Sequence, residues 1–193
     1  MAQLALFESG PRLLVNDATG RIEYTPEFID AATAARWFAA LRDEVPWRGE
    51  RRRMYDRDVD VPRRHAAYRL DDRALPHALH EAAERVSAGA GAPFNGAGLN
   101  LYRDGRDSVA PHNDHLYEIV EGFPIALLTL GSTRRMTIRS KMRPRRVFDV
   151  DLEAGSLLVM SYETQLHYDH GIPKTADPAG ERISVAFRVK PPV

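Results

Sequence analysis

The sequence predicts an α+β protein in which two N-terminal helices lie against a barrel or jelly roll of short strands. Two segments of the first half, residues 25–44 and 72–87, repeat apolar residues at helical spacing. From Phe94 onward, short runs of β-branched and large apolar residues alternate with turn residues. The chain has 193 residues, enough to bury a sizeable core in one domain. We therefore expect a single domain over residues 1–193.

The first predicted helix begins at Thr25-Pro26-Glu27-Phe28, where a capping residue precedes a proline at the first helical position. Its apolar stripe consists of Phe28, Ile29, Ala32, Ala35, Phe38 and Leu41. The stripe carries the helix to about Glu44. Pro46 then ends it, because the residue before a proline avoids helical dihedral angles.

A second helix is predicted from about Asp72 to Ser87, with Pro76 near its start, where a missing N–H group costs least. Residues 89–93, with two glycines and a proline, end it. The segment between the helices, residues 48–64, is strongly charged. Valine and aspartate alternate within it at 58–61, which indicates short strands or a hairpin.

Six strands are predicted in the second half of the chain, separated by turn residues such as Asp104-Gly105 and Ala154-Gly155. They are Leu99–Tyr102, Ile125–Leu130, Arg135–Arg139, Val147–Leu152, Ser156–Ser161 and Ile183–Val189. Evenly spaced strands after two helices favour a two-sheet barrel or jelly roll with the helices outside it.

Composition limits the chemistry that the chain can carry out. Its 27 basic and 27 acidic residues balance, so the net charge does not favour an acidic partner. It has no cysteine, so a metal ion would have to be held by histidine and carboxylate groups. No signal sequence or long apolar run is present, so we expect a cytoplasmic protein without membrane association. We also expect a monomer.

His112 and Asp114 are two positions apart, so on an extended backbone both side chains leave the same face. Two imidazoles and one carboxylate with open positions form the facial triad of non-haem Fe(II) sites that use O₂. A later histidine, His167 or His170, would complete such a site. The pair alone is weak evidence, because short motifs often occur by chance.

The segment Arg182–Arg188 alternates strictly between two kinds of residue. Ile183, Val185 and Phe187 would pack against a second layer, while Arg182, Ser184, Ala186 and Arg188 would share the other face. Two arginines separated by small side chains suit the bidentate binding of a small dicarboxylate such as 2-oxoglutarate. The alternative is a solvent-facing strand with two surface arginines. Asn100 and Tyr102 also share a face, which could line a polar site or belong to a half-exposed strand.

Further stretches are similar to those of one known family. They are Pro46-Trp47-Arg48, Pro62-Arg63, Leu99-Asn100, Tyr102-Arg103-Asp104-Gly105, Leu130-Gly131-Ser132-Thr133-Arg134-Arg135, Gly155-Ser156-Leu157-Leu158-Val159-Met160, Glu163-Thr164-Gln165 and His170-Gly171-Ile172-Pro173-Lys174-Thr175-Ala176. Through them the chain resembles the AlkB-type Fe(II)/2-oxoglutarate-dependent dioxygenases over about residues 25–190. The resemblance implies a double-stranded β-helix core at residues 94–193. It also implies that residues 1–93 hold helices and a nucleotide-recognition lid.

The resemblance implies roles for particular residues as well. His112, Asp114 and His170 match the metal ligands, with His170 preferred to His167 because Gly-Ile-Pro follows it. The residues that match the cosubstrate pocket are Asn100, Tyr102, Arg182, Ser184 and Arg188. Arg182 would bind the far carboxylate of 2-oxoglutarate and Arg188 would lie near its keto-acid end.

The activity implied is the oxidative demethylation of N-alkylated bases in single-stranded or opened DNA or RNA. It uses Fe(II), O₂ and 2-oxoglutarate and releases succinate, CO₂ and formaldehyde. The residues implied to meet the substrate are Arg63, Tyr68, His115 and Tyr117. The chain departs from the family in this shell. His115 and Leu116 replace acidic residues, Ala67 replaces an aromatic residue, and Ser184 replaces an asparagine. These departures predict a shifted or relaxed base preference.

Nucleic-acid binding would also need phosphate contacts and stacking residues. Basic residues are concentrated at 134–146 and at 48–53, and Tyr55, Tyr68 and Tyr117 are candidates for stacking on a base. Two other interpretations stay open. An oxygenase of the same fold could act on a protein side chain, a lipid or a small molecule, and a decayed fold could be a non-enzymatic binding module.

Overall fold

The protein is described by a computed structural model that covers the backbone of residues 10–54 and 57–192, with the side chains of residues 50–60 outside the description. Within this range the strands form a sheet of eight and a sheet of four. The larger sheet contains, in spatial order, β1 (Arg12–Asp17), β2 (Gly20–Thr25), β10 (Leu157–Met160), β7 (Ile125–Gly131), β12 (Arg182–Arg188), β5 (Gly96–Tyr102), β4 (Arg57–Arg69) and β3 (Arg48–Met54). The smaller sheet contains β6 (Val109–His112), β11 (Tyr168–Ile172), β8 (Arg134–Ser140) and β9 (Val147–Leu152).

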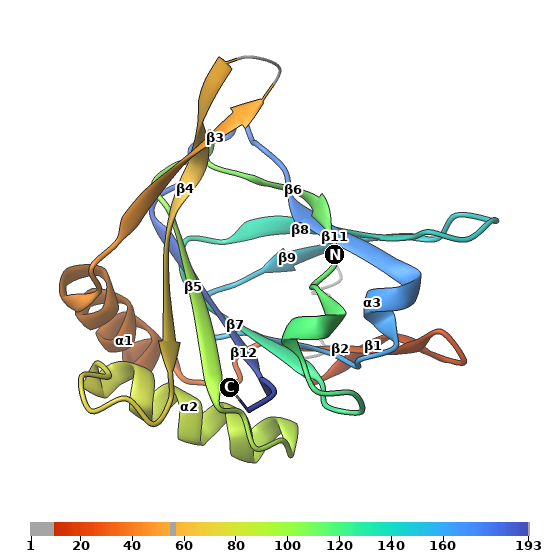
Figure 1. The fold of residues 1–193 in the computed structure, drawn as a ribbon, viewed down its shortest axis with the longest axis horizontal. Helices are drawn as coiled ribbons and strands as arrows, with labels where there is room; N and C mark the ends of the chain where they lie inside the picture. Colours follow the sequence, from red (N-terminus) through yellow and green to blue (C-terminus); the bar gives the residue numbers. More distant parts are fainter. Residues whose placement is uncertain (1–9, 55–56, 193) are drawn as a thin grey trace, which may run out of the picture.

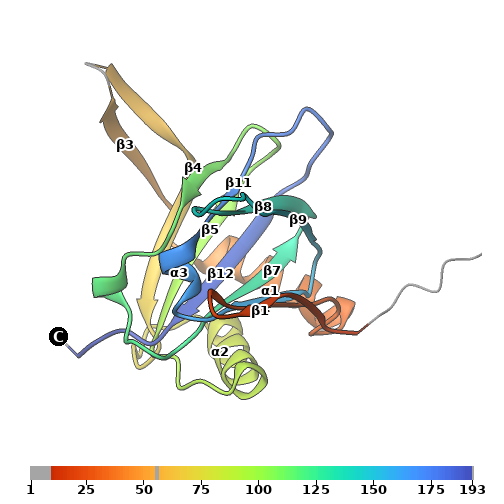
Figure 2. The ribbon, with the colours of Figure 1, turned by 90° about the vertical axis from the view of Figure 1, so that its right-hand side faces the viewer.

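Three layers result from this arrangement. Figure 1 shows the two long helices, α1 (Ala31–Glu44) and α2 (His77–Ala90), side by side on the outer face of the larger sheet. Figure 2 shows the smaller sheet on the opposite side, with the β3–β4 hairpin projecting beyond both sheets. This mostly β architecture with a jelly-roll core confirms the predicted fold class.

Two separate apolar clusters fill the spaces between the layers. One cluster joins α1 and α2 to the outer face of the larger sheet and includes Ile183, Val185 and Phe187. The other lies between the sheets and includes Tyr102, Ile138 and Ala186. The predicted alternation along β12 is therefore confirmed, because its branched and aromatic residues face the helices while its other face looks between the sheets.

The first helix begins later than predicted. Thr25 belongs to β2, where it pairs with Leu157, so a long-range sheet contact claims the residue that we expected to cap a helix. The cap is Asp30, whose carboxylate accepts a hydrogen bond from the backbone N–H of Thr33 at 2.9 Å. The predicted end at Glu44 is confirmed.

The second helix is displaced toward the C-terminus. Residues 72–75 form turns, in which the backbone N–H of Leu75 donates to the carbonyl of Asp72, and Pro76 occupies the capping position. The helix continues to Ala90, past the predicted end at Ser87. It stops at Gly91, which has a left-handed φ of 63°. This is the conformation in which helices commonly end at glycine.

The six predicted strands and the hairpin expected within residues 48–64 are confirmed, with small differences at their ends. Four further strands, β1, β2, β6 and β11, were not predicted. The two short ones, β6 and β11, lack a clean apolar alternation, and β6 contains Pro111. Proline is tolerated there because β6 is an edge strand, whose outer side forms no ladder.

The boundary that we expected at residue 93, between helices with a lid and a β core, runs through the larger sheet. Strands β1, β2, β3 and β4 all precede it in the sequence, yet they belong to the larger sheet together with β5, β7, β10 and β12. The N-terminal part therefore contributes to the core sheet and is more than helices and a lid. No helix in the described part of the chain is long and apolar enough to cross a membrane.

Candidate metal centre and cosubstrate pocket

Three potential ligands meet between the sheets near the end of β6. His112 is the last residue of β6 and lies directly opposite His170 of β11 in the antiparallel ladder. Asp114 follows two residues later. One ligand atom from each of the three side chains lies within 4.8 Å of the others, and the two imidazole centroids are 4.6 Å apart. Within the described residues, His167 is not part of this group.

Asp114 reaches the cluster by a different route from the one predicted. Strand β6 ends at His112, so a shared strand face does not bring the carboxylate to the histidine. The backbone N–H of Asp114 instead donates to the side-chain carbonyl of Gln165 at 2.9 Å, in a buried contact with α3 (Thr164–His167). Lys141 Nζ donates to Asn113 Oδ1, also at 2.9 Å. Contacts from α3 and the end of β8 therefore hold this turn.

Gln165 was not predicted as a functional residue. It is 1% exposed, and its amide also donates to Thr164 Oγ1. A fully buried glutamine side chain must find hydrogen-bond partners. The burial of Gln165 depends on the tertiary structure, so its residue type alone did not mark it as functional.

The surroundings of the three groups suit a divalent metal ion. Nδ1 of His112 lies 3.0 Å from the carbonyl oxygen of Ala110, so Nε2 is the ring nitrogen left to face a ligand. Burial and the neighbouring His112 lower the pKa of His170 to about 4, so this imidazole is neutral near pH 7. Burial would raise the pKa of Asp114, but the charge and hydrogen bond of Arg188 outweigh burial and lower it. A carboxylate and histidines with free lone pairs form the ligand set of non-haem Fe(II) sites.

A cavity adjoins these ligands and brings together the side chains predicted for the cosubstrate. Its walls include Asn100 and Tyr102 from β5 and Arg182, Ser184 and Arg188 from β12. Asn100 pairs with Ser184 and Tyr102 pairs with Arg182, so these residues of β5 and β12 lie directly opposite each other in the sheet. The remaining wall is largely apolar and consists of Val109, Ile125, Leu127, Met136, Met160, Ile172 and Ala186. These apolar residues were not predicted as part of the site.

Arg182 has the most unusual environment in the cavity. It is 0% exposed, and its Nη2 donates a hydrogen bond to Thr129 Oγ1 at 3.0 Å. Its Nε and Nη1 have no hydrogen-bond partner among the described residues. Burial lowers its pKa from the ordinary value. A buried guanidinium with two unpartnered donor atoms fits a bound carboxylate, which would accept both hydrogen bonds.

Arg188 contacts one of the three candidate ligands directly. Its Nε donates to Asp114 Oδ2 at 2.7 Å, and its Nη1 donates to the carbonyl of Ala186 at 3.2 Å. We predicted a contact with the keto-acid end of 2-oxoglutarate, and that contact stays a prediction. The structure adds that Arg188 keeps Asp114 charged and oriented.

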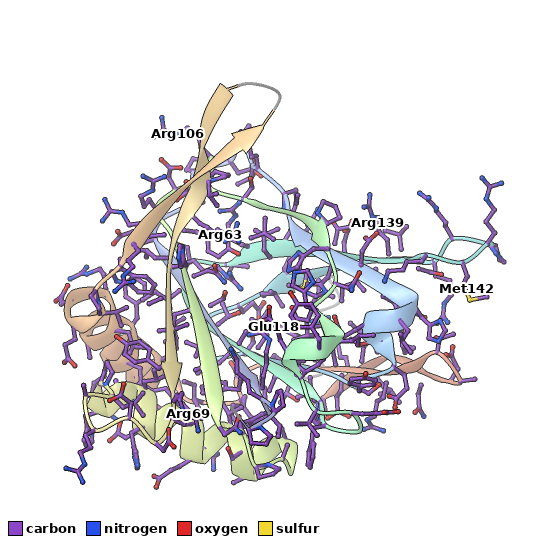
Figure 3. The ribbon with its side chains drawn as sticks, in the orientation of Figure 1. Arg63, Arg69, Arg106, Glu118, Arg139 and Met142 are labelled. Carbon is purple, nitrogen blue, oxygen red and sulfur yellow. The ribbon has the colours of Figure 1, made fainter. Side chains whose placement is uncertain are left out.

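The residues predicted to meet the substrate are divided among three places. Arg63 lines the same cavity and donates from Nε to Asn100 Oδ1 at 2.7 Å (Figure 3). Tyr68 packs against the apolar cluster that joins α1 and α2 to the larger sheet, so the structure does not bring it to the cavity. His115 and Tyr117 are exposed and stacked, with ring centroids 5.3 Å apart. Tyr55 lies outside the described residues.

The two-sheet fold and the set of two histidines and one carboxylate define the class of this protein, a non-haem iron oxygenase of jelly-roll architecture. The sequence model of the family described as "2OG-Fe(II) oxygenase superfamily" matches residues 21–188. The chain belongs to the 2OG-Fe(II) oxygenase superfamily, whose members use Fe(II), 2-oxoglutarate and O₂, and within it to the AlkB type.

Three similar proteins illustrate this membership. The chain is 33% identical to bovine "DNA oxidative demethylase ALKBH2" over 117 residues, which are 57% of this chain and 42% of that protein. It is 29% identical to human "Alpha-ketoglutarate-dependent dioxygenase alkB homolog 3" over 187 residues, 87% of this chain and 65% of that protein. The chain thus spans less than two thirds of either relative. A solved structure, "The structure of OsALKBH1", shares the fold with a TM-score of 0.65 at 12% identity, covering 92% of this chain and 100% of that one.

Replacing single histidines tests the ligand assignment. His170→Ala should lose Fe(II) binding, because it removes one of three converging ligands, whereas His167→Ala should retain it. Anaerobic Fe(II) titration with a measurement of bound metal per chain distinguishes the two variants. Iron retained by His170→Ala and lost by His167→Ala would show that the wrong histidine was assigned.

Proposed function

We propose that this protein is an Fe(II)/2-oxoglutarate-dependent dioxygenase that oxidatively demethylates N-alkylated bases of DNA or RNA. The observation that carries the proposal is Arg182, a fully buried cation with unpartnered donors, in the same cavity as the three ligands. The similar proteins, a DNA oxidative demethylase and an α-ketoglutarate-dependent dioxygenase, support the substrate class and the cosubstrate.

His112, Asp114 and His170 would hold the metal ion, and Arg182 would bind the distal carboxylate of 2-oxoglutarate. When bound, Fe(II) with the keto acid and O₂ supplies the oxidation of a C–H bond, with succinate and CO₂ as the other products. On an N-methyl group the hydroxylated carbon leaves as formaldehyde and the base is restored. The protein's own contribution is orientation. Arg188 holds Asp114, Arg63 holds Asn100, and the apolar wall keeps water from the reacting atoms.

Part of the basic stretch at residues 134–146 offers positive charge for a phosphate backbone. The basic residues of 134–146 do not form one patch. Arg134 is buried, Arg135 and Arg139 pair with Asp151 and Asp169, and Arg146 pairs with Asp17. Within the described residues, Arg143 and Arg145 are exposed and have no ion pair.

The turn between β8 and β9 carries these two free cations, together with Met142, which is 57% exposed. Figure 3 shows Met142 at the far end of this projecting hairpin. Lys141, which precedes Met142, donates a hydrogen bond to Asn113, the neighbour of the candidate ligand Asp114. We infer that this hairpin tip, together with the exposed His115–Tyr117 stack, meets the nucleic acid. The β3–β4 hairpin adds exposed Arg48, while the side chains of Arg51–Arg53 lie outside the described residues.

Replacing the buried arginine tests the cosubstrate site. Arg182→Met keeps most of the side-chain volume but removes the charge-assisted hydrogen bonds, each of which contributes about 1.5–3 kcal/mol. The Kd of the iron-loaded protein for 2-oxoglutarate, measured by anaerobic equilibrium dialysis, should therefore rise about tenfold or more. Fe(II) binding by the same variant is the internal control, because Arg182 is not a metal ligand. An unchanged Kd would remove Arg182 from the pocket.

The substrate class is tested by activity on methylated oligonucleotides. Iron-loaded protein with 2-oxoglutarate and ascorbate should remove a methyl group from 1-methyladenine or 3-methylcytosine and release formaldehyde, both measured by mass spectrometry and a formaldehyde assay. The His115→Asp variant should change activity on one base more than on the other if this position tunes base choice. Succinate formation with a protein, lipid or small molecule, and none with either base, would replace this function with the other oxygenase activity.

The hairpin tip makes a separate prediction about salt. Arg143→Gln and Arg145→Gln should each reduce the slope of log Kd against log salt concentration by about 0.7–0.9, because each would remove one phosphate contact. Arg69→Gln makes the same change in charge on the far side of the molecule (Figure 3) and should leave the slope unaltered. Equal slopes for all three variants and the parent protein would exclude the hairpin from the binding surface.

A further inference from the structure

Arg134 is a second buried arginine near the cosubstrate cavity. It is the first residue of β8 and is 3% exposed. Its guanidinium donates to three backbone carbonyls. Nη1 donates to Asp104 at 3.0 Å, and Nη2 donates to Asp107 at 2.9 Å and to Pro173 at 2.7 Å. A buried cation is costly unless it is well hydrogen-bonded, so these three contacts are what keep Arg134 in place.

The three carbonyls belong to two loops that leave different sheets. Asp104 and Asp107 lie between β5 and β6, and Pro173 directly follows β11. The loops also touch each other, because the backbone N–H of Thr175 donates to the carbonyl of Gly105 at 2.9 Å. A Cβ atom on Gly105 would lie 2.6 Å from the Thr175 carbonyl oxygen, so this close approach requires glycine. Arg134 and Gly105 together hold the two loops against each other, and we call this arrangement the clasp.

The clasp lies beside Tyr102, which lines the cavity together with Arg182. Tyr102 is the last residue of β5, immediately before the first clasped loop, and it pairs with Arg182. The guanidinium carbons of Arg134 and Arg182 lie 5.7 Å and 5.1 Å from the centroid of the Tyr102 ring. Arg134 does not line the cavity itself. It therefore reaches a bound molecule only through Tyr102 and the clasped loops.

We propose that Arg134 is a positioning residue for cosubstrate binding: it fixes the clasped loops and the adjoining Tyr102, so that Arg182 can bind the distal carboxylate. This inference rests on the proposed function, since it takes 2-oxoglutarate to be the ligand. The metal ligands lie on β6, on β11 and in the turn after β6, and none of them contacts Arg134 through a hydrogen bond in the described residues. The effect of Arg134 should thus be confined to the carboxylate end of the cosubstrate.

Arg134→Lys tests the proposal, because it keeps the positive charge but cannot donate to all three carbonyls with the same planar geometry. Two ligands are compared by anaerobic equilibrium dialysis with iron-loaded protein. These are 2-oxoglutarate and 2-oxobutyrate, which is also a 2-oxo acid but has no distal carboxylate. The Kd for 2-oxoglutarate should rise about tenfold, which corresponds to about 1.4 kcal/mol, while the Kd for 2-oxobutyrate stays unchanged.

The chain offers a matched control and a second variant. Arg135→Lys makes the same change at the next position of β8, where the side chain is exposed and pairs with Asp151, and should alter neither Kd. Gly105→Ala should separate the clasped loops without removing a charge, and it should reproduce the selective loss of 2-oxoglutarate binding. It also keeps the proposal testable if Arg134→Lys fails to fold, as judged by circular dichroism.

Each outcome has a definite meaning. A folded Arg134→Lys or Gly105→Ala protein that keeps the parent's ratio of the two Kd values overturns the positioning role, whether both affinities fall or neither does. A parent protein that holds iron but binds 2-oxoglutarate no better than 2-oxobutyrate overturns the proposed cosubstrate site and this inference together. A selective loss in both variants, with Arg135→Lys unaffected, supports it.

Discussion

The burial of Arg182 is the constraint on which the rest of the site depends. Removing a guanidinium from water costs several kcal/mol unless charges or hydrogen bonds compensate it, and here Thr129 and the Tyr102 ring supply only part of that compensation. The larger sheet can hold such a residue because Arg182 lies on β12, at the centre of the strand order and paired on both sides. A strongly packed sheet therefore keeps the proposed carboxylate-binding group in place before a carboxylate binds, which would reduce the entropy lost on binding.

The turn that carries Asn113 and Asp114 is held by polar contacts from several elements, whereas Arg182 is held within one packed sheet. Asp114 receives a hydrogen bond from Arg188 of β12 and donates its backbone N–H to Gln165 of α3. His170 is fixed by its place in a ladder between β6 and β8. The larger sheet, the smaller sheet and a short helix thus all act on one small cluster. A ligand set placed by so many independent contacts has little freedom to rearrange, as a preorganised metal centre requires.

Different parts of the fold contain the apolar clusters and the exposed surface that we propose meets the substrate. The helices and the outer face of the larger sheet bury one apolar cluster that contains no residue of the metal cluster. The space between the sheets contains the second cluster together with the cavity. The projecting segments, the β8–β9 turn and the exposed His115–Tyr117 stack, carry the free charge and the aromatic surface. Under the proposed function, base preference can change in these segments without disturbing the proposed metal and cosubstrate groups, which is consistent with the replacement of acidic residues by His115 and Leu116.

The sequence by itself determined the features that depend on local periodicity and on residue chemistry. The strict alternation of β12 placed Arg182, Ser184 and Arg188 on one face, and the same reasoning placed Asn100 and Tyr102 together. Turn residues and apolar runs located six strands and the end of the first helix, because side-chain period and backbone propensity are properties of neighbouring residues. The family resemblance added the choice of His170.

Only the tertiary structure decided which segments meet, since pairing between distant strands leaves little trace in either strand alone. It assigned Thr25 to a sheet, carried Asp114 past the end of β6, and turned Tyr68 toward the helices. It also divided one basic stretch into a buried Arg134, several ion-paired arginines and the free pair Arg143 and Arg145. The physical reason is that the role of a charged side chain depends on its burial and its partners, and both are set by residues far away in the sequence.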